Sequence, residues 1–462
     1  MRKNPKNIRI EKDSMGNVNI PKNALYGPQT QRAVDNFKIS NLVMPKEFII
    51  ALLDIKRSAA QANKNLRILN QKKSNSIIKS IDYIKKNYNQ SEFPVDVFQT
   101  GSGTSTNMNV NEVISNISRK KYKTIVHPND DVNLCQSSND VIPSAISISC
   151  ARLVHNNLLP AMTHLSKTIN KKSKELKGIA KTGRTHLMDA MPLTFEQELA
   201  SWKSQVDEDI ANIKVSLNNI KKIPIGGTAI GSGINAHKNF AKEFIKSLSL
   251  NNGFRFYLKN NKFTGLSFQN DSAALSSSIK LSSITLTKIS NDLRWMNSGP
   301  LSGLGEISLT ALQPGSSIMP GKVNPVIPES VLMACTKILG NDLSVNIAAS
   351  SGSFQLNVML PLIAYNTIES IYLLSNSSLS LADKAISGFK VNKDVVSNSV
   401  SSNPILVTAL NKIIGYEKGA LIAKRAYIEG RDIIDIAAEE TDLSEKELEK
   451  ILNPIKLTLG GL

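Results

Sequence analysis

The sequence predicts an all-α protein with a central bundle of long helices. Between Pro192 and Pro224 the chain has no glycine or proline, and apolar residues recur at steps of three or four residues. This spacing places one apolar stripe along a helix of about thirty residues, or about 45 Å. Thr194 followed by Gln197 forms a capping box at the start of this helix. The residues of the stripe are Phe195, Leu199, Trp202, Val206, Ile210, Ile213, Leu217 and Ile220.

A second stretch has the same periodicity, from Leu275 to Met296, with Ser282 filling the one polar step. One neighbouring helix cannot cover stripes of this length, so we expect the helices to bundle within the subunit and between subunits. The other apolar positions of this stretch are Ile279, Leu286, Ile289 and Leu293.

The remaining chain is organised around this bundle, and we expect three domains. These are a mainly helical N-terminal domain at 1–136, the long-helix bundle at 137–390 and a small helical C-terminal domain at 391–462. The apolar spacing becomes shorter beyond about Gly388, and Pro404 opens the last helical stretch.

The composition is basic. The 462 residues include 56 Lys and Arg against 38 Asp and Glu, a formal net charge of +18, and only 5% are aromatic. The basic side chains are spread along the whole chain, whereas a nucleic-acid-binding protein would need a clustered patch. We therefore expect a solvated basic surface that attracts small anions, and no nucleic-acid partner. A basic nucleic-acid-binding protein remains the alternative from a different class.

The sequence has no run of eighteen apolar residues, which a membrane-spanning helix would need. Its first residues, MRKNPKNIRIEKDSMG, lack the apolar stretch of a signal peptide. We expect a cytoplasmic protein without a membrane partner. Cys135, Cys150 and Cys335 are far apart and have no CxxC spacing, so we expect reduced, buried thiols and no zinc site.

Four polar segments punctuated by glycine or proline interrupt the helical pattern. They are TGSGTSTNMN, VHPNDDVNLCQSSND, KTGRTHLMDA and QPGSSIMPGKVNP. A helical run follows each, so we expect several hydroxyl and amide side chains near helix N-termini, where free N–H groups and the helix dipole favour anions. The simpler interpretation is that these side chains only cap helices. The residues concerned are Thr104, Ser137, Ser138, Thr185 and Asn324.

Two motifs resemble nucleotide sites but do not fit them. In GSSIMPGK the two glycines are separated by five residues, one more than a phosphate-binding P-loop has, and Val323 replaces the hydroxyl that would bind magnesium. GSGINA, beginning at Gly231, matches a dinucleotide fingerprint in letters, but no alternation of strands and helices surrounds it.

The segment QPGSSIMPGKVNP could carry a base. A serine is a poor base unless its alkoxide is stabilised, and Lys322, loop N–H groups and the helix entered through Pro325 could stabilise it. Gly315 and Gly321 would allow the loop to close over a substrate and exclude water. The alternative is a rigid connector rich in proline.

GSSIMPGKVNP resembles the signature of the fumarase/aspartase superfamily, whose members add or eliminate a small molecule across fumarate or a fumaryl group. The segments DSMGNVNIPKNALYGPQTQRAV, TGSGTSTNMNVNEVI and GRTHLMDAMPLTFEQE resemble other patterns of the superfamily, so the resemblance covers nearly the whole chain. Within the superfamily, HPNDDVN, QSSND, GGTAIGSG and NDLRWMNSGP are similar to class II fumarate hydratases. TSTNMN and PVIPE also resemble aspartate ammonia-lyases, which remain the second candidate. Cys135 and Leu301 depart from the pattern, which usually has serine and arginine there.

The resemblance implies reversible anti addition of water to fumarate, giving L-malate, without a cofactor. It makes Ser316 the base that removes the C3 proton of malate, and it pairs His186 with Glu329 to assist the water. It also implies a homotetramer around a twenty-helix core, with three domains per subunit. Its substrate contacts fall on Ser102, Thr104, Ser137, Ser138, Asn139, Thr185, Lys322 and Asn324, and a secondary dicarboxylate site on His127, Asn129 and Asp130.

The residue types suit this chemistry. Removing a proton next to a carboxylate adds negative charge to it, so the transition state needs donors already aimed at those oxygens, and Lys322 and Asn324 would supply them. We expect no metal because the histidines lack metal-ligand spacing. His155, His164 and His237 are left without a role.

Overall fold

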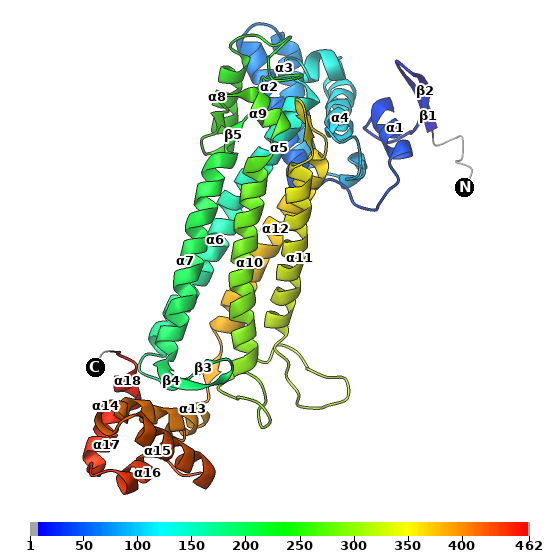
Figure 1. Cartoon of the computed structure of the whole chain (residues 1–462). Coiled ribbons are helices and arrows are strands. Elements are labelled where there is room, and N and C mark those ends of the chain that lie inside the picture. The colour runs from blue at the N-terminus through cyan, green and yellow to red at the C-terminus, as the bar shows by residue number, and fades with distance from the viewer. Residues whose placement is uncertain (1–7, 461–462) are drawn as a thin grey trace. The chain divides into compact units, whose positions relative to one another are not determined.

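Helices make up most of the computed structural model, which describes residues 8–460 (Figure 1). Among these residues the strands form five two-stranded sheets. The prediction of an all-α fold is therefore confirmed. The chain has two compact units, and the long helices run through both. The first consists of Met1–Pro160, Ala211–Leu281 and Thr336–Leu374, and the second of Ala161–Ile210, Ser282–Cys335 and Ser375–Leu462.

The two predicted long helices are α7, Phe195–Ile220, and α10, Asn270–Met296. Every residue of the two predicted apolar stripes is buried, and Ile210 is the most exposed of them at 7%. The capping box at the start of α7 is also confirmed. The backbone N–H of Thr194 donates to Gln197 Oε1 at 2.9 Å, and the N–H of Gln197 donates to Thr194 Oγ1 at 3.1 Å.

The first unit begins with a hairpin of β1, Ile8–Asp13, and β2, Gly16–Pro21, which pair antiparallel from Ile8 opposite Pro21 to Asp13 opposite Gly16. Its helices and short helical turns are α1 (Pro28–Asn36), α2 (Lys46–Asn65), α3 (Gln71–Lys86), η2 (Gln90–Glu92), α4 (Thr104–Tyr122), η3 (Pro128–Val132), α5 (Ser138–Leu153), η4 (Val154–Leu158), α8 (Phe240–Asn252) and α9 (Lys262–Ser267). The short strand pairs are β5 (Lys222–Ile223) with β6 (Tyr257–Leu258) and β8 (Gly352–Ser353) with β9 (Leu356–Asn357).

Small polar side chains join the long helices inside the first unit. Ser216 of α7 shares a hydrogen bond of 2.8 Å with Ser278 of α10. Ser276 of α10 donates to Asp342 of α11, Val326–Ala349, at 2.8 Å. Asn341 of α11 donates to Glu369 of α12, Leu360–Leu381, also at 2.8 Å. Buried polar groups on neighbouring helices are therefore paired with one another.

The second unit contains α6, Leu159–Glu175, and a hairpin of β3, Ala180–Thr185, and β4, Met188–Thr194. β7, Ile307–Ser308, pairs with β10, Lys390–Val391. The remaining elements are η5 (Ala382–Ile386), α13 (Lys393–Ser401), η6 (Pro404–Leu410), α14 (Asn411–Ile414), α15 (Tyr416–Glu429), α16 (Ile433–Glu440), α17 (Glu445–Ile451) and α18 (Pro454–Leu457).

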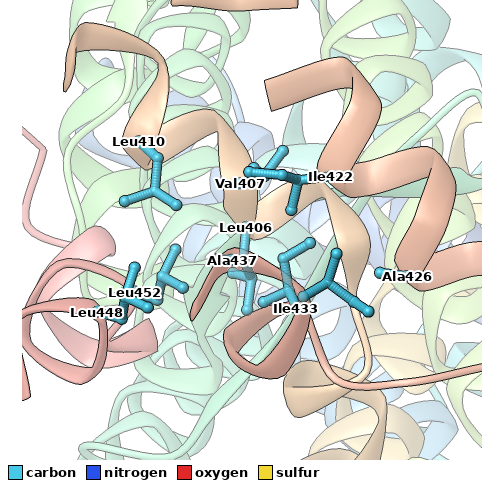
Figure 2. Packing of buried hydrophobic residues seen from close by; sticks show 10 residues of the cluster. Leu406, Val407, Leu410, Ile422, Ala426, Ile433, Ala437, Leu448 and Leu452 are labelled. Atoms are coloured by element: carbon cyan, nitrogen blue, oxygen red, sulfur yellow. The ribbon is translucent and has the colours of Figure 1, made fainter. Parts of the chain in front are cut away.

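The C-terminal helices enclose a hydrophobic core of their own, shown in Figure 2. η6, α15, α16 and α17 each contribute buried apolar side chains to it. The division into domains 1–136, 137–390 and 391–462 stays a prediction. The core residues are Leu406, Val407, Leu410, Ile422, Ala426, Ile433, Ile436, Ala437, Leu448 and Leu452.

None of the helices within residues 8–460 is long and apolar enough to cross a membrane. Cys135, Cys150 and Cys335 are free and buried, as the sequence predicts. Burial raises the pKa of the Cys150 thiol to about 12 and that of Cys335 to about 11.

The C-terminal core supplies a test of the packing. Ile422 is fully buried on α15, whereas its neighbour Leu421 is 50% exposed. Replacing Ile422 by Ala removes buried methyl groups and leaves a cavity, so we expect the opening free energy of this region to fall by about 2–5 kcal/mol. The change Leu421→Ala should alter it by less than about 1 kcal/mol. Native-state hydrogen exchange of the α15 and α16 amides measures both, and equal effects would contradict the assigned core.

Candidate active site

The start of α4 presents two hydroxyl groups side by side. Thr104 is the first residue of α4, and its Oγ1 lies 2.7 Å from Ser102 Oγ. The N-cap is Gly103, with φ of 71°, and it supplies no side-chain cap. A Cβ at this position would lie 2.9 Å from Ile142 on α5. Glycine therefore both permits the left-handed backbone and lets the starts of α4 and α5 pack closely.

The start of α5 carries the next predicted group. Ser137 is the N-cap, and it forms a capping box with Asp140. Ser138 is the first helical residue, and its Oγ accepts a hydrogen bond of 3.1 Å from Asn107 Nδ2 on α4. The hydroxyls of the first two polar segments therefore lie at helix N-termini, as the sequence predicts, and the hydrogen bond between Asn107 and Ser138 joins the two helices. Such a place favours an anion, because both helix dipoles are positive there.

Asn139 and Asp140 tie this helix start to the loop at 226–229. Asn139 Nδ2 donates to the carbonyl of Ala229 at 2.8 Å. The Asp140 carboxylate accepts from the N–H groups of Gly226 and Thr228 at 2.8 and 2.9 Å. The segment GGTAIGSG is thus held by hydrogen bonds to QSSND.

A buried lysine lies behind the same segment. Lys56 of α2 is fully buried, and its Nζ donates to Asn133 Oδ1 at 2.8 Å and to Gln136 Oε1 at 3.0 Å. Burial lowers the pKa of Lys56 to about 7, while the negative charge of Asp140 acts in the other direction. Our sequence interpretation missed both residues. The spacing Ser137-x-x-Asp140 is a capping-box signal that predicts the second one, but nothing in the sequence distinguishes Lys56 from a surface lysine.

The predicted secondary site is only partly assembled. A cavity of about 470 Å³ in the first unit is lined by His127 and Asn129. Its charged lining residues are the cationic Lys12 and Arg119 and the acidic Glu11, Asp13 and Glu112. His127 caps the following turn, because its Nδ1 accepts from the backbone N–H of Asp130 at 3.1 Å. Asp130 itself is not part of the cavity wall, and its side chain is 81% exposed.

The third polar segment corrects one prediction. Thr185 does not lie near a helix N-terminus: it ends β3, and His186 and Leu187 form the turn to β4 with φ of 58° and 61°. Two successive residues with positive φ are the conformation of a tight hairpin turn, usually made by Asn-Gly. Because this turn has neither residue, no hairpin could be predicted from it. His186 is exposed at the tip.

The fourth polar segment folds back on itself. The N–H of Gly315 donates to the carbonyl of Lys322 at 2.8 Å, and Asn324 Nδ2 donates to the carbonyl of Gly315 at 2.7 Å. A Cβ on Gly315 would lie 2.4 Å from that Lys322 oxygen, so only glycine fits there. The closed loop, 315–324, leads directly into α11 and places Asn324 near its N-terminus, as predicted.

Within this loop, Ser316 receives two backbone donors. The N–H groups of Ile318 and Met319 point at Ser316 Oγ, at 3.2 and 3.0 Å. Donors in this position stabilise negative charge on the oxygen. Glu329 lies in the first turn of α11, where a negative charge is favourable. Within residues 8–460 of one chain, no hydrogen bond or ion pair joins the His186 ring to Glu329, so their pairing stays a prediction.

Comparison with known proteins identifies the family. Residues 16–340 match the family model described as lyase, and residues 406–459 match the one described as fumarase C C-terminus. The chain is 53% identical over 460 residues to a Xylella fastidiosa protein named "Fumarate hydratase class II", covering 99% of this chain and 97% of the relative. The chain belongs to the class II fumarate hydratases.

Two further comparisons agree with this family. A Pseudomonas aeruginosa protein named "Fumarate hydratase class II 2" is 52% identical over 455 residues, 98% of this chain and 99% of the relative. A crystal structure of class II fumarase from Schistosoma mansoni is 36% identical with a TM-score of 0.94, covering 98% of this chain and 99% of that one. Membership of the class II fumarate hydratases confirms the resemblance read from the sequence and the all-α fold.

The titration of Asp140 gives a test of the α5 start. Burial raises its pKa from 3.8 to about 6, although three backbone N–H groups and Lys56 favour the carboxylate. The folded chain therefore binds this proton more tightly than the unfolded chain does. Its contribution to stability is complete below about pH 4 and is lost as the pH rises to about 6. We therefore expect the thermal unfolding midpoint of the wild type to decrease, relative to that of Asp140→Asn, as the pH is raised from about 4.5 to about 6.5. If thermal scans show the same difference in midpoint between the wild type and Asp140→Asn at every pH, the raised pKa of Asp140 would be contradicted.

Proposed function

We propose that the chain catalyses the reversible anti addition of water to fumarate, giving L-malate. Membership of the class II fumarate hydratases supports this activity, because curated relatives of nearly the same length carry that name. The observation that carries the proposed mechanism is the pair of backbone N–H groups directed at Ser316 Oγ.

Ser316 is the proposed base that removes the C3 proton of malate. A serine hydroxyl is far too weak an acid to be ionised at neutral pH without help. The N–H groups of Ile318 and Met319 already donate to its oxygen, and the Lys322 ammonium in the same loop adds a positive charge. Together these donors favour the alkoxide over the alcohol, which makes proton removal from carbon feasible.

The starts of α4 and α5 are the proposed binding place for a substrate carboxylate. At α4 the N-cap is Gly103, which has no side chain to cap the helix. The N–H of Thr106, the third helical residue, donates to Gln99 Oε1 at 3.0 Å, whereas the N–H groups of Thr104 and Ser105 have no side-chain acceptor within residues 8–460. Two dipoles and a group of hydroxyls can therefore face the charge that builds up on the carboxylate when the proton leaves. The proposed contacts are Ser102, Thr104, Ser137, Ser138 and Asn139, with Thr185, Lys322 and Asn324 from the other segments.

His186, paired with Glu329, is proposed to position and activate the water. His127, Asn129 and Asp130 form the proposed secondary dicarboxylate site, which the cavity beside His127 supports. We also propose that the protein is cytoplasmic, as the sequence indicates.

We further propose a homotetramer whose active sites combine residues from several subunits. α10 and α11 expose large apolar side chains in the single chain, and a neighbouring subunit would cover them. The α7 and α10 helices contain 26 and 27 residues, so the two ends of each lie about 40 Å apart. Predicted site residues flank such helix ends, and neighbouring helices from other subunits can bring unlike ends together. The exposed residues include Leu281, Ile284, Met333, Leu343 and Ile347.

The activity is tested by the nucleophile that the purified protein adds. We expect fumarate to be consumed in buffer without ammonium, giving L-malate, because the proposed site activates water. Loss of fumarate absorbance together with chiral analysis of the product measures this. Strict dependence on ammonium, with aspartate as product, would instead make the chain an aspartate ammonia-lyase, the second candidate.

The shared site is tested by complementation. Ser316→Ala and His186→Asn subunits should each keep only a small residual activity alone, since each lacks one proposed catalytic group. When they are unfolded together and refolded as mixed tetramers, a site has an even chance of an intact serine and, from another subunit, of an intact histidine. About 25% of wild-type activity should therefore return.

Recovery no greater than the sum of the two single variants, in tetramers shown by mass spectrometry to be mixed, would place both residues in one chain. Separately refolded variants combined without unfolding serve as the control, because their subunits remain unmixed.

A further inference from the structure

The second unit contains a buried group of charges behind the hairpin that carries His186. Glu306 immediately precedes β7 and is only 2% exposed. One of its carboxylate oxygens lies 2.9 Å from Lys181 Nζ, and the other forms an ion pair with Arg184. Both cations belong to β3, so a single carboxylate contacts the strand at two points. The contact with Lys181 is an ion pair by distance, without hydrogen-bond geometry at the carboxylate oxygen.

The two cations differ in how they depend on Glu306. Lys181 is 2% exposed and has a second carboxylate partner, Glu198 of α7, at 2.8 Å. Arg184, by contrast, forms no ion pair other than the one with Glu306 within residues 8–460. Arg184 is also the closer of the two to the turn, since only Thr185 separates it from His186. Loss of the Glu306 charge would therefore free the end of β3 next to His186, while Lys181 would stay bound to Glu198.

Glu306 itself is held firmly from the other side. Its carbonyl accepts a hydrogen bond of 2.9 Å from the N–H of Asn392, and Asn392 Nδ2 donates to the carbonyl of Gly305 at 2.7 Å. The following residues, Ile307 and Ser308, pair with β10. A buried carboxylate on a fixed backbone is a rigid anchor, and its charge must be compensated by partners in one geometry.

We infer that Glu306 is a positioning residue for His186: it binds Lys181 and Arg184 of β3 and so fixes the direction in which the hairpin turn presents the imidazole. The inference rests on the proposed role of His186. Glu306 touches no proposed substrate contact with its carboxylate, so it acts only through the hairpin. Ion pairing by a buried carboxylate suits this task because it restricts the strand in rotation as well as in position.

The variant Glu306→Gln tests this, with Glu198→Gln as the matched control. Both remove a carboxylate that binds Lys181, but only the first also removes the partner of Arg184. We expect Glu306→Gln to lower kcat for fumarate hydration at least about tenfold, since small displacements of a catalytic group have effects of this size. KM should change by a smaller factor than kcat, because Thr185 is the one proposed binding group on this hairpin and the others lie on other elements. Glu198→Gln should keep kcat within about twofold of the wild type.

A second measurement separates positioning from general damage. In the His186→Asn background, Glu306→Gln should lower the residual kcat no further, because the group it positions is already gone. The same factor of loss in both backgrounds, or equal kcat for Glu306→Gln and Glu198→Gln, would overturn the inference. If Glu306→Gln does not fold, Arg184→Met replaces it with the same expected loss of kcat, and an unchanged kcat would again overturn the inference. A wild-type protein that does not hydrate fumarate would contradict the proposed function instead.

Discussion

Burial of one apolar stripe along each long helix is the constraint on which the other features depend. On α7 every stripe residue from Phe195 to Ile220 is at most 7% exposed. Full burial of a side chain such as Val, Leu or Phe contributes about 1.5–3 kcal/mol. Because this stabilisation comes from the sides of the helices, their ends and the connecting segments are free to carry glycine, hydroxyl and charged residues. The proposed functional groups lie at such ends or in such segments, Glu329 in the first turn of α11.

Helix N-termini serve two purposes in this structure, and the partner of the free N–H groups distinguishes them. At α1 the buried Glu112 carboxylate accepts from the N–H groups of Gly27, Gln29 and Thr30. The N–H groups at the start of α1 are therefore occupied by a side chain of the protein, and this helix start has a structural role. At α4 the cap is Gly103, which offers no side chain. A helix start at which some N–H groups remain without an acceptor can receive a substrate carboxylate. The polar segments therefore need not all have the same role.

The sequence was most informative where periodicity decides the structure. The α7 and α10 stripes, the Thr194 capping box and the helix starts at Thr104 and Ser137 were predicted because local spacing determines them. The hairpin was missed because His186 and Leu187 replace the usual turn residues. Lys56 and Glu306 were missed for another reason. The sequence does not distinguish a buried lysine or glutamate from an exposed one, and only the fold determines which partners compensate the buried charge.

The backbone of the turn at His186 is strained, and buried contacts hold it in place. A residue other than glycine in the left-handed region costs about 1–2 kcal/mol, and His186 and Leu187 both adopt it. A glycine or asparagine in the turn would relieve this strain, but at the first position it would remove the imidazole. The strand pairs of β3 and β4 and the buried ion pairs of Glu306 hold the turn in place against that cost. Strain kept at an exposed tip by a buried anchor is expected where the direction of one side chain matters more than the stability of the turn.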